Sequence, residues 1–181
     1  VIVHGSRPQV NEQLRLKGFA PQFVGTQRIT DAPALECAKE AAGEIRLDLE
    51  ALFSQGLPNT AMQNARVRVM SGNFVTARPV GVVDGVDFMH TGMVRKVDAE
   101  AIRTALNHNT VVLMSPLGFS PTGEAFNLAM EDIAVQTAIA LNADKLMFLT
   151  ETPSLRDEQG NTITELEYDD AEAMLNAGLI P

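Results

Sequence analysis

The stretch Val1-Ile2-Val3-His4-Gly5-Ser6-Arg7-Pro8-Gln9 predicts a short apolar strand, a turn with one glycine, and the start of a helix. Such an arrangement can hold an anion with backbone N–H groups and a helix N-terminus. Close approach of a phosphate to backbone normally requires several glycines, because a Cβ fills the space. Here Gly5 is the only glycine of the turn, and Ser6 and Arg7 carry side chains where the phosphate would lie. The order of elements favours a nucleotide site, whereas the residues of the turn argue against one.

Helices are predicted at regular intervals beyond this turn. The first runs from residue 8 to about 17, and a long one begins at Thr30 or Asp31 and ends near Gln55. Within the long helix, apolar residues recur at steps of three and four. Gly56 and Pro58 are expected to end it. Further helices are expected from a cap at Asp98 to about residue 107, at 131–141 and at 168–176.

Strands are predicted between these helices. Continuous apolar runs at 110–115 and 145–150 are typical of buried parallel strands. Residues 67–70 and 74–77 are predicted to form a hairpin, Asp84-Gly85 is a strong turn pair, and a further turn is expected at 157–161. The alternation, with a hairpin-rich insert at 67–97, predicts an α/β protein: a three-layer α/β/α sandwich with a mostly parallel sheet.

The composition and net charge of the chain argue against several classes of function. The chain has 181 residues, 45% of them hydrophobic, and a formal net charge of −9. This charge argues against nucleic acid or an anionic membrane as a partner, and no apolar run is long enough for a membrane span. The single cysteine, Cys37, cannot form an internal disulfide, which suits a reducing cytoplasm. We expect a cytoplasmic protein in which Cys37 is a small buried hydrophobe rather than a nucleophile.

Two loops are the candidate walls of a ligand site. In open α/β sheets, ligands bind beyond the carboxyl ends of the strands. The loop 118–123 and the turn 4–9 both follow predicted buried strands. A plain crossover loop is the alternative for 118–123. His4, His90 and His108 share no metal-ligand spacing, so no histidine metal site is expected.

Two further positions have a functional and an ordinary interpretation. Arg28 could hold a carboxylate in a bidentate fork, with Thr30 adding a hydroxyl. On spacing alone, a capping sequence with an exposed Arg28 is favoured. Asn127 and Glu131, four residues apart at the predicted start of a helix, would face the same side. Acidic residues in a first turn are equally typical of ordinary helix-dipole partners.

Together these residues resemble the amino-acid kinase family, in order and over essentially the whole chain. Residues 3–9 resemble the family's phosphate turn, and 28–30 resemble its contact to an amino-acid carboxylate. Residues 126–131 fall where the kinases carry an Asn-x-Asn-Ala-Asp run, and 145–151 resemble the strand that leads into the nucleotide site. Residues 56–60, 73–79 and 115–124 are similar to the N-acetylglutamate synthase branch of the family.

The departures from the family pattern imply a domain that kept the fold and lost the kinase chemistry. Ser6 and Arg7 replace glycines, and Glu131 replaces an aspartate that organises phosphate-binding lysines. Phosphoryl transfer depends on positioning and charge stabilisation, so these changes should abolish it. We expect no catalytic residue, a vestigial phosphate loop at His4, Gly5, Ser6 and Arg7, and a vestigial amino-acid and nucleotide site at Arg28, Thr30, Asn127 and Glu131.

In the synthase branch, such a domain precedes an acetyltransferase domain that transfers an acetyl group from acetyl-CoA to L-glutamate, the first step of arginine biosynthesis. The resemblance implies a regulatory domain with L-arginine as effector, assembly into a homo-oligomer, and no cofactor or metal of its own. Residues 1–181 are expected to be a partial kinase-like domain, truncated at both ends. A catalytic lysine would lie before Val1 and the acetyltransferase domain after Pro181. The alternatives are an active N-acetylglutamate kinase and a ligand-free scaffold that assembles through the helix at 31–55.

Overall fold

The structure is a computed structural model that describes residues 1–55, 57, 59–61, 63, 67–149 and 161–178. It divides into two compact units, 1–146 and 147–181, and each is considered by itself. Gly56, Pro58, residue 150 and most of the turn expected at 157–161 lie outside the described residues.

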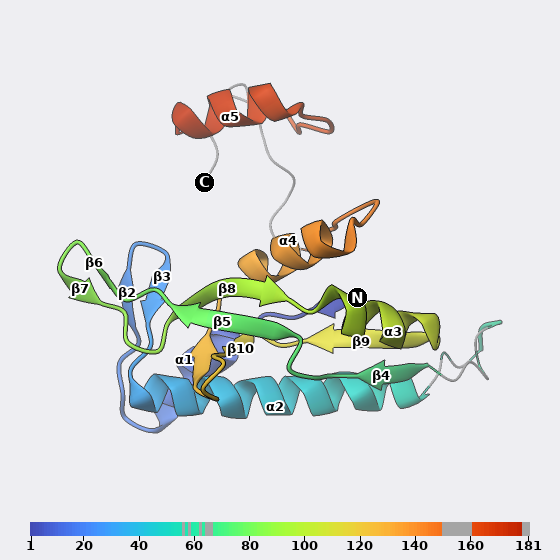
Figure 1. The fold of residues 1–181 in the computed structure, drawn as a ribbon, viewed down its shortest axis with the longest axis horizontal. Coiled ribbons are helices and arrows are strands. Elements are labelled where there is room, and N and C mark those ends of the chain that lie inside the picture. Colours follow the sequence, from blue (N-terminus) through green and yellow to red (C-terminus); the bar gives the residue numbers. More distant parts are fainter. Residues whose placement is uncertain (56, 58, 62, 64–66, 150–160, 179–181) are drawn as a thin grey trace. The chain divides into compact units, whose positions relative to one another are not determined.

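A parallel sheet lies at the centre of the first unit (Figure 1). Strand β9 (Thr110–Met114) lies between β1 (Ile2–Val3) and β4 (Arg68–Met70) and is parallel to both. Val112, Leu113 and Met114 are buried. The apolar run predicted at 110–115 is therefore a buried parallel strand, as expected.

A second, mixed sheet has the order β11-β10-β5-β8. Strand β5 (Val75–Pro79) is antiparallel to β8 (Gly92–Val97) and parallel to β10 (Leu117–Phe119), which is antiparallel to β11 (Ala125–Asn127). Two hairpins stand apart from these sheets. They are β2–β3 (Gln22–Val24 and Gln27–Ile29) and β6–β7 (Val82–Val83 and Val86–Asp87).

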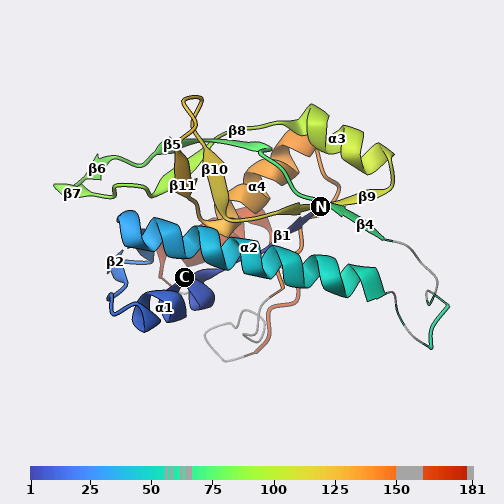
Figure 2. The same ribbon diagram turned by 90° about the horizontal axis from the view of Figure 1, so that it is seen from below.

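Helices cover both faces of the strands. Figure 2 shows α1 (Arg7–Leu16) and α2 (Ala32–Gln55) in front of the strands and α4 (Met130–Leu141) behind them, so the three-layer α/β/α arrangement is confirmed. Helix α3 (Ala99–Asn107) packs on β9 and α4. The second unit contains α5 (Tyr168–Asn176). None of the helices in the described residues is long and apolar enough to span a membrane.

Local signals placed the helix starts correctly. The Asp98 carboxylate accepts a hydrogen bond from the Ala101 amide at 3.0 Å, and the Asp31 carboxylate accepts one from the Ala34 amide at 2.9 Å. Both are N-cap bonds that satisfy an otherwise unpaired donor of the first turn. The turn at Asp84-Gly85 joins β6 to β7 with positive φ at both residues, 49° and 79°, as the sequence predicted.

Two separate hydrophobic cores stabilise the first unit. One lies between the strands and α3–α4 and includes Val112, Phe126 and Ile133. The other lies between α1 and α2 and includes Leu14 and Cys37. Cys37 is fully buried in the second core, which confirms its role as a small hydrophobe.

Two strand predictions are wrong. Residues 67–70 and 74–77 form no hairpin, because β4 pairs with β9 while β5 pairs with β8 and β10. Residues 145–149 form no strand and are exposed, because an apolar run by itself specifies neither a hydrogen-bonding partner nor a surface to pack against. The alternative interpretation of 118–123 as a plain crossover loop does not hold either, because 118 and 119 belong to β10 and the turn to β11 follows.

Candidate functional site

The turn at residues 4–9 follows β1 and lies at the carboxyl ends of β1 and β9. Val3 is level with Met114 in the parallel register, so β1 and β9 end side by side. The His4 amide donates to the Met114 carbonyl at 3.1 Å, and His4 Nε2 lies 3.0 Å from Ser115 Oγ. His4 Nδ1 lies 3.1 Å from the Gly5 carbonyl, which only accepts, so Nδ1 carries the proton and Nε2 accepts from Ser115. Burial lowers the pKa of His4, which is partly offset by the bond to Gly5, so the ring is neutral at pH 7.

The two non-glycine residues of the turn behave differently. Ser6 is buried, and its carbonyl accepts from the Val10 amide in the first turn of α1 at 2.9 Å. Arg7 is exposed, and its Nη2 donates to the carbonyl of Thr26 in the β2–β3 loop at 3.3 Å. Arg7 is thus held by the hairpin, whereas Ser6 brings a buried side chain to the turn. A Cβ at Gly5 would meet Met130 Cγ at 3.6 Å, an ordinary contact.

Arg28 is buried, contrary to the expectation of an exposed side chain next to a cap. Its exposed fraction is 7%, and its Nη2 donates to Asn11 Oδ1 on α1 at 2.5 Å. The guanidinium carbon lies 4.6 Å from the centroid of the Phe23 ring. Nη1 is buried and has no hydrogen-bond partner in the described residues. Burial, and then the neighbouring Arg7 cation, lower the pKa of Arg28.

Thr30 belongs to a closed hydrogen-bond network rather than to an open site. The Thr91 hydroxyl donates to the Arg28 carbonyl at 2.6 Å, so at 2.9 Å the Thr30 hydroxyl donates to Thr91 Oγ1. The Asn127 amide nitrogen donates to Thr30 Oγ1 at 3.1 Å, and the Thr30 amide donates to Thr91 Oγ1 at 3.1 Å. Thr30 is fully buried, and its hydrogen bonds link the end of β3 to the start of β8 and to β11.

Asn127 and Glu131 do not share a helix face. Asn127 is the last residue of β11, whereas α4 begins at Met130 and carries Glu131 in its first turn. Glu131 is exposed, and no ion pair in the described residues involves it. The next residue, Asp132, accepts from the Val94 amide at 2.9 Å and so ties α4 to β8.

The glycines of 118–123 serve the β10–β11 hairpin. A Cβ at Gly118 would come within 2.7 Å of Leu128 Cδ1 and 2.9 Å of Ala77 Cβ, so close packing requires glycine there. Gly123 has φ of +90° in the turn, where its amide donates to the Ser120 carbonyl at 3.0 Å. The 4–9 turn contacts Met114, Ser115 and Thr26, and Gly5 lies near Met130. None of these residues belongs to the loop 118–123.

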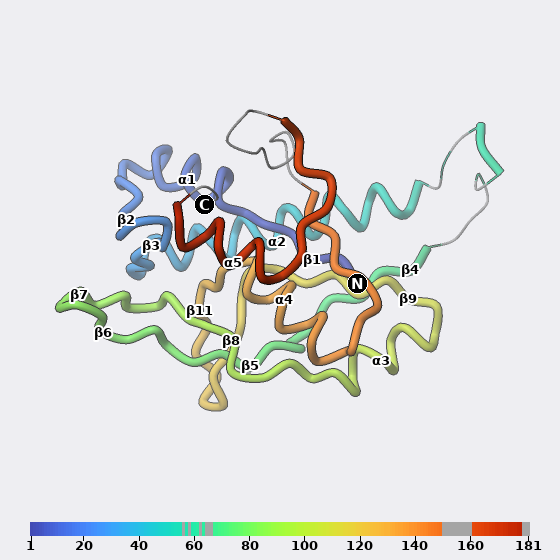
Figure 3. The backbone as a smooth tube through the Cα atoms, turned by 90° about the horizontal axis from the view of Figure 1, so that it is seen from above, coloured from blue at the N-terminus to red at the C-terminus, as the bar shows by residue number. Residues whose placement is uncertain are grey.

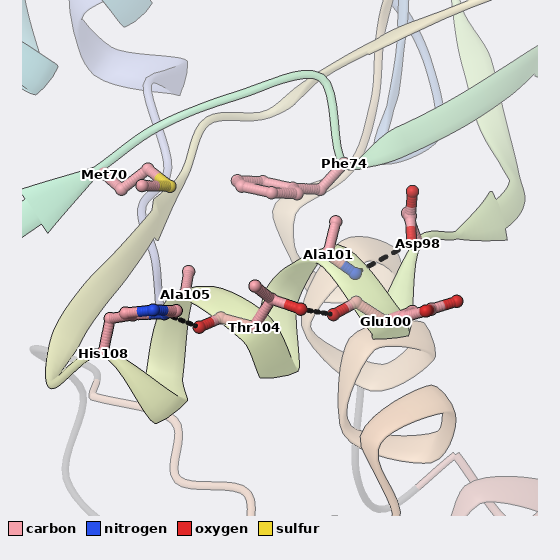
Figure 4. A pocket seen from close by; sticks show the side chains of 8 residues that line it. All are labelled: Met70, Phe74, Asp98, Glu100, Ala101, Thr104, Ala105 and His108. Atoms are coloured by element: carbon pink, nitrogen blue, oxygen red, sulfur yellow. Dashed lines mark hydrogen bonds between the residues drawn. The ribbon is translucent and has the colours of Figure 1, made fainter.

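Two surface hollows include none of the residues predicted for the vestigial phosphate loop or the vestigial amino-acid and nucleotide site. One, of about 590 Å³, lies between α3 and the segment that joins β4 to β5, with Met70 and Phe74 opposite the helix (Figure 4). The other, of about 710 Å³, lies along α1 and the following loop and includes Asn11 but not Arg28. In the described residues, no group of three or more histidine, cysteine or acidic side chains is arranged to hold a metal.

Four residues of this region were not predicted from the sequence. Asn11, Phe23, Thr91 and Ser115 contact Arg28, Thr30 or His4, and three of these partners lie 17, 61 and 111 positions away in the chain. No local pattern identifies such partners. A signal existed only for Ser115, because the ends of adjacent parallel strands meet at one edge of a sheet.

The layered α/β fold, with a strand, turn and helix at residues 1–16, is that of an amino-acid kinase-like protein. The model of the amino acid kinase family matches residues 1–181, and the chain belongs to that family.

The most similar curated relatives found include two amino-acid acetyltransferases. The protein from Ralstonia nicotianae is 61% identical over 178 residues, and that from Azotobacter vinelandii is 51% identical over 175. These matches cover 98% and 97% of this chain, but the chain spans only 40% of the length of either relative.

Solved structures agree with this match. N-acetylglutamate synthase from Neisseria gonorrhoeae, complexed with coenzyme A and L-arginine, has a TM-score of 0.88 at 33% identity, covering 96% of this chain and 41% of that protein. Carbamate kinase from Giardia, at 16% identity and a TM-score of 0.62, covers 98% of this chain and 66% of its own and shares the fold.

Proposed function

We propose that this chain is the regulatory, kinase-inactive domain of an N-acetylglutamate synthase. The whole protein transfers an acetyl group from acetyl-CoA to L-glutamate in the first step of arginine biosynthesis, and this domain carries the feedback effect of L-arginine. Residues 1–181 are then a partial kinase-like domain. The acetyltransferase domain, which uses acetyl-CoA and glutamate, belongs to the remainder of the protein.

The observation that carries the proposal is the likeness to the Neisseria synthase. The chain matches 41% of that protein with a TM-score of 0.88, and that protein is complexed with coenzyme A and L-arginine. A second structure of the same synthase, complexed with coenzyme A and N-acetyl-glutamate, has a TM-score of 0.84. This chain also spans 40% of the length of the two acetyltransferase relatives.

The residues of the turn favour an inactive kinase site. Ser6 brings a buried side chain to the turn, and no ion pair in the described residues links Glu131 to a lysine. Thr30 is fully buried and its hydroxyl bonds Thr91 and Asn127, so it is not exposed to a substrate. His4, Gly5, Ser6 and Arg7 are then a vestigial phosphate loop, and Arg28, Thr30, Asn127 and Glu131 a vestigial amino-acid and nucleotide site.

The test uses the full-length protein that contains this chain. It receives glutamate, N-acetylglutamate, acetyl-CoA and MgATP, and released CoA and ADP are followed in parallel. We expect CoA release that depends on glutamate and responds to L-arginine, without ADP. Effector binding of this kind couples two states by typically about 1–3 kcal/mol.

The alternative, an active N-acetylglutamate kinase, predicts ADP release that depends on N-acetylglutamate. The double variant Ser6→Gly with Arg7→Gly restores the glycine turn and is the matched control. We expect it to form no ADP either, because Glu131 also departs from the kinase pattern.

The full protein is further proposed to be a cytoplasmic homo-oligomer. The long helix α2 is a candidate contact between subunits, with Leu47 and Leu52 exposed by 58% and 60%. If L-arginine changed neither the thermal stability nor the oligomer size of the full protein, a ligand-free scaffold would be the better description.

A further inference from the structure

Three cations lie on the exposed part of the mixed sheet without an acidic partner. Arg78 on β5 and Arg95 and Lys96 on β8 are exposed, and in the described residues none of them forms an ion pair. Figure 3 shows the two strands side by side. Neither strand contains an acidic residue, so these positive charges are not balanced within the strands.

The strand register places an aromatic side chain beside these cations. Thr76 of β5 is level with Lys96 on one side and with Phe119 of β10 on the other. Residues level with each other in adjacent strands project to the same face of a sheet, and so do residues two apart in one strand. Arg78, Lys96 and Phe119 therefore share one face, on which Phe119 is 39% exposed.

The two faces of this sheet are covered differently. On the opposite face, Val75, Ala77 and Val97 belong to the core between the strands and α3–α4. On the face that carries the cations, Leu117 packs against the core between α1 and α2. Two residues further along β10, Phe119 is exposed. The helices thus cover this face at the start of β10 and leave Phe119 and the cations of β5 and β8 in contact with solvent.

The ordinary roles of surface cations do not explain this face. Four other cations each pair with a glutamate: Arg15, Lys17, Lys39 and Arg46. A lysine on an edge strand, such as Lys96 on β8, commonly prevents the strands of two molecules from pairing. Arg78 needs another explanation, because β5 has a neighbouring strand on each side. Arginine and exposed aromatic residues are instead enriched in interfaces between proteins.

The regulatory role proposed above requires a contact between this domain and the catalytic part of the protein. Energetic coupling between distant sites is carried by packed side chains and ion pairs that have two arrangements. The chain spans 40% of the length of the acetyltransferase relatives, so most of such a protein lies outside it. We propose that Arg78, Arg95, Lys96 and Phe119, here called the basic sheet face, bind an acidic surface of the acetyltransferase part. This inference rests on the proposed function.

The side chains of the basic sheet face define the chemistry of the surface that it binds. Arg78 and Arg95 have planar forks that bind carboxylates in bidentate geometry, and Lys96 adds a third positive charge. Phe119 supplies an apolar contact between them and α2. The complementary surface therefore carries Asp or Glu carboxylates beside an exposed apolar side chain. Because the attraction is electrostatic and lies near solvent, salt should weaken it.

Chemical modification of lysines in the full-length protein tests whether the basic sheet face is covered. Lys96 and Lys39 are both exposed in this chain, so Lys39 on α2 is the reference. Brief treatment with acetic anhydride followed by mass spectrometry gives the rate for each lysine, divided by its rate in the urea-unfolded protein. We expect Lys96 to react about fivefold more slowly than Lys39 at low salt, at the lower end of typical coupling between sites, and equally fast at high salt.

Charge variants of the full-length protein test whether this contact carries the regulation. Arg78→Gln with Lys96→Gln removes two cations from the basic sheet face. Arg15→Gln with Lys39→Gln removes two exposed cations elsewhere and is the matched control. We expect the effect of L-arginine on glutamate-dependent CoA release to fall about fivefold in the first variant and to stay unchanged in the control.

Three results would overturn the proposal. The first is equal modification rates for Lys96 and Lys39 at low salt, and the second is an unchanged effect of L-arginine in the Arg78→Gln, Lys96→Gln variant. The third is a smaller oligomer of that variant by light scattering, which would make a second copy the occupant of the face. A wild type that releases no CoA with glutamate contradicts the proposed function, whereas these three results contradict the docking surface alone.

Discussion

At the residue scale, His4 shows how burial sets the behaviour of one side chain. Its ring bridges Ser115 and the Gly5 carbonyl at the ends of β1 and β9. Burial disfavours the charged imidazolium and lowers the pKa of His4 from its ordinary value of 6.5. The folded protein therefore binds a proton at this site less readily than the unfolded chain does.

This difference predicts a pH dependence of stability. Well above pH 6.5 the ring is neutral in both states, and the contribution of His4 to the free energy of unfolding is complete. As the pH falls below that value, the unfolded chain is protonated first, so stability decreases until the lowered pKa is passed. Urea denaturation at a series of pH values should show this decrease in the wild type and a flatter profile in His4→Gln.

His108→Gln, which changes an exposed histidine at the end of α3, controls for the loss of a histidine as such. An unchanged slope in His4→Gln would contradict the assignment.

Arg28 shows which properties of a single residue can be predicted from the sequence and which cannot. The Asp98 cap was predictable because donor and acceptor lie three residues apart. The burial of Arg28 was not, because it depends on Asn11 and Phe23, which different elements bring to it. Spacing around 28–31 placed the cap at Thr30 or Asp31, of which Asp31 is the one observed, and by itself favoured an exposed Arg28.

At the element scale, the sequence predicts helices better than strand partners. Helix α5 has the bounds expected, and α1 begins one residue before the expected position, because caps and apolar periodicity are local signals. Strand pairing depends on residues far apart in the chain. Thus β4 and β5 were placed in sequence but paired wrongly, since β4 pairs 42 positions away with β9.

Two glycines in different elements should respond oppositely to alanine. At Gly118 in β10, a Cβ would lie 2.9 Å from Ala77 Cβ, so Gly118→Ala should lower the free energy of unfolding by about 1–3 kcal/mol through overpacking. At Gly43 inside α2, a Cβ meets no atom within 4 Å, so Gly43→Ala should raise it by about 0.5–1 kcal/mol.

Chemical denaturation of both variants measures the pair against one wild type. If Gly118→Ala proved as stable as the wild type, close packing would not be the reason for glycine at that position.

At the scale of the whole molecule, the first unit has two cores with different elements around them. Leu14 belongs to the core between α1 and α2, and Ile133 belongs to the core between the strands and α3–α4. The class of fold was predictable from the alternation of helices and strands. The division into two cores was not, because it follows from which strands pair.

Mutations in separate cores should act independently. We expect Leu14→Ala to cost about 2–5 kcal/mol and Ile133→Val about 0.5–1.5 kcal/mol of the free energy of unfolding. The double variant should equal their sum within about 0.5 kcal/mol, because the residues share no core cluster.

The control pairs Ile133→Val with Ile102→Val, since both residues lie in the same core. Strong coupling between Leu14 and Ile133 would mean that the packing of the two cores is energetically connected in the folded state.

The hydrogen bonds around Thr30 couple the local unfolding of three segments of the chain. The Thr30 amide donates to Thr91, the His90 amide to the Thr30 carbonyl, and the Asn127 amide to the His90 carbonyl. The backbone N–H groups of three segments that are distant in the chain thus donate hydrogen bonds within one network. Since none of these amides is freed without disturbing the next, their exchange with deuterated solvent should report one shared opening event, while the exposed end of the β2–β3 hairpin exchanges on its own.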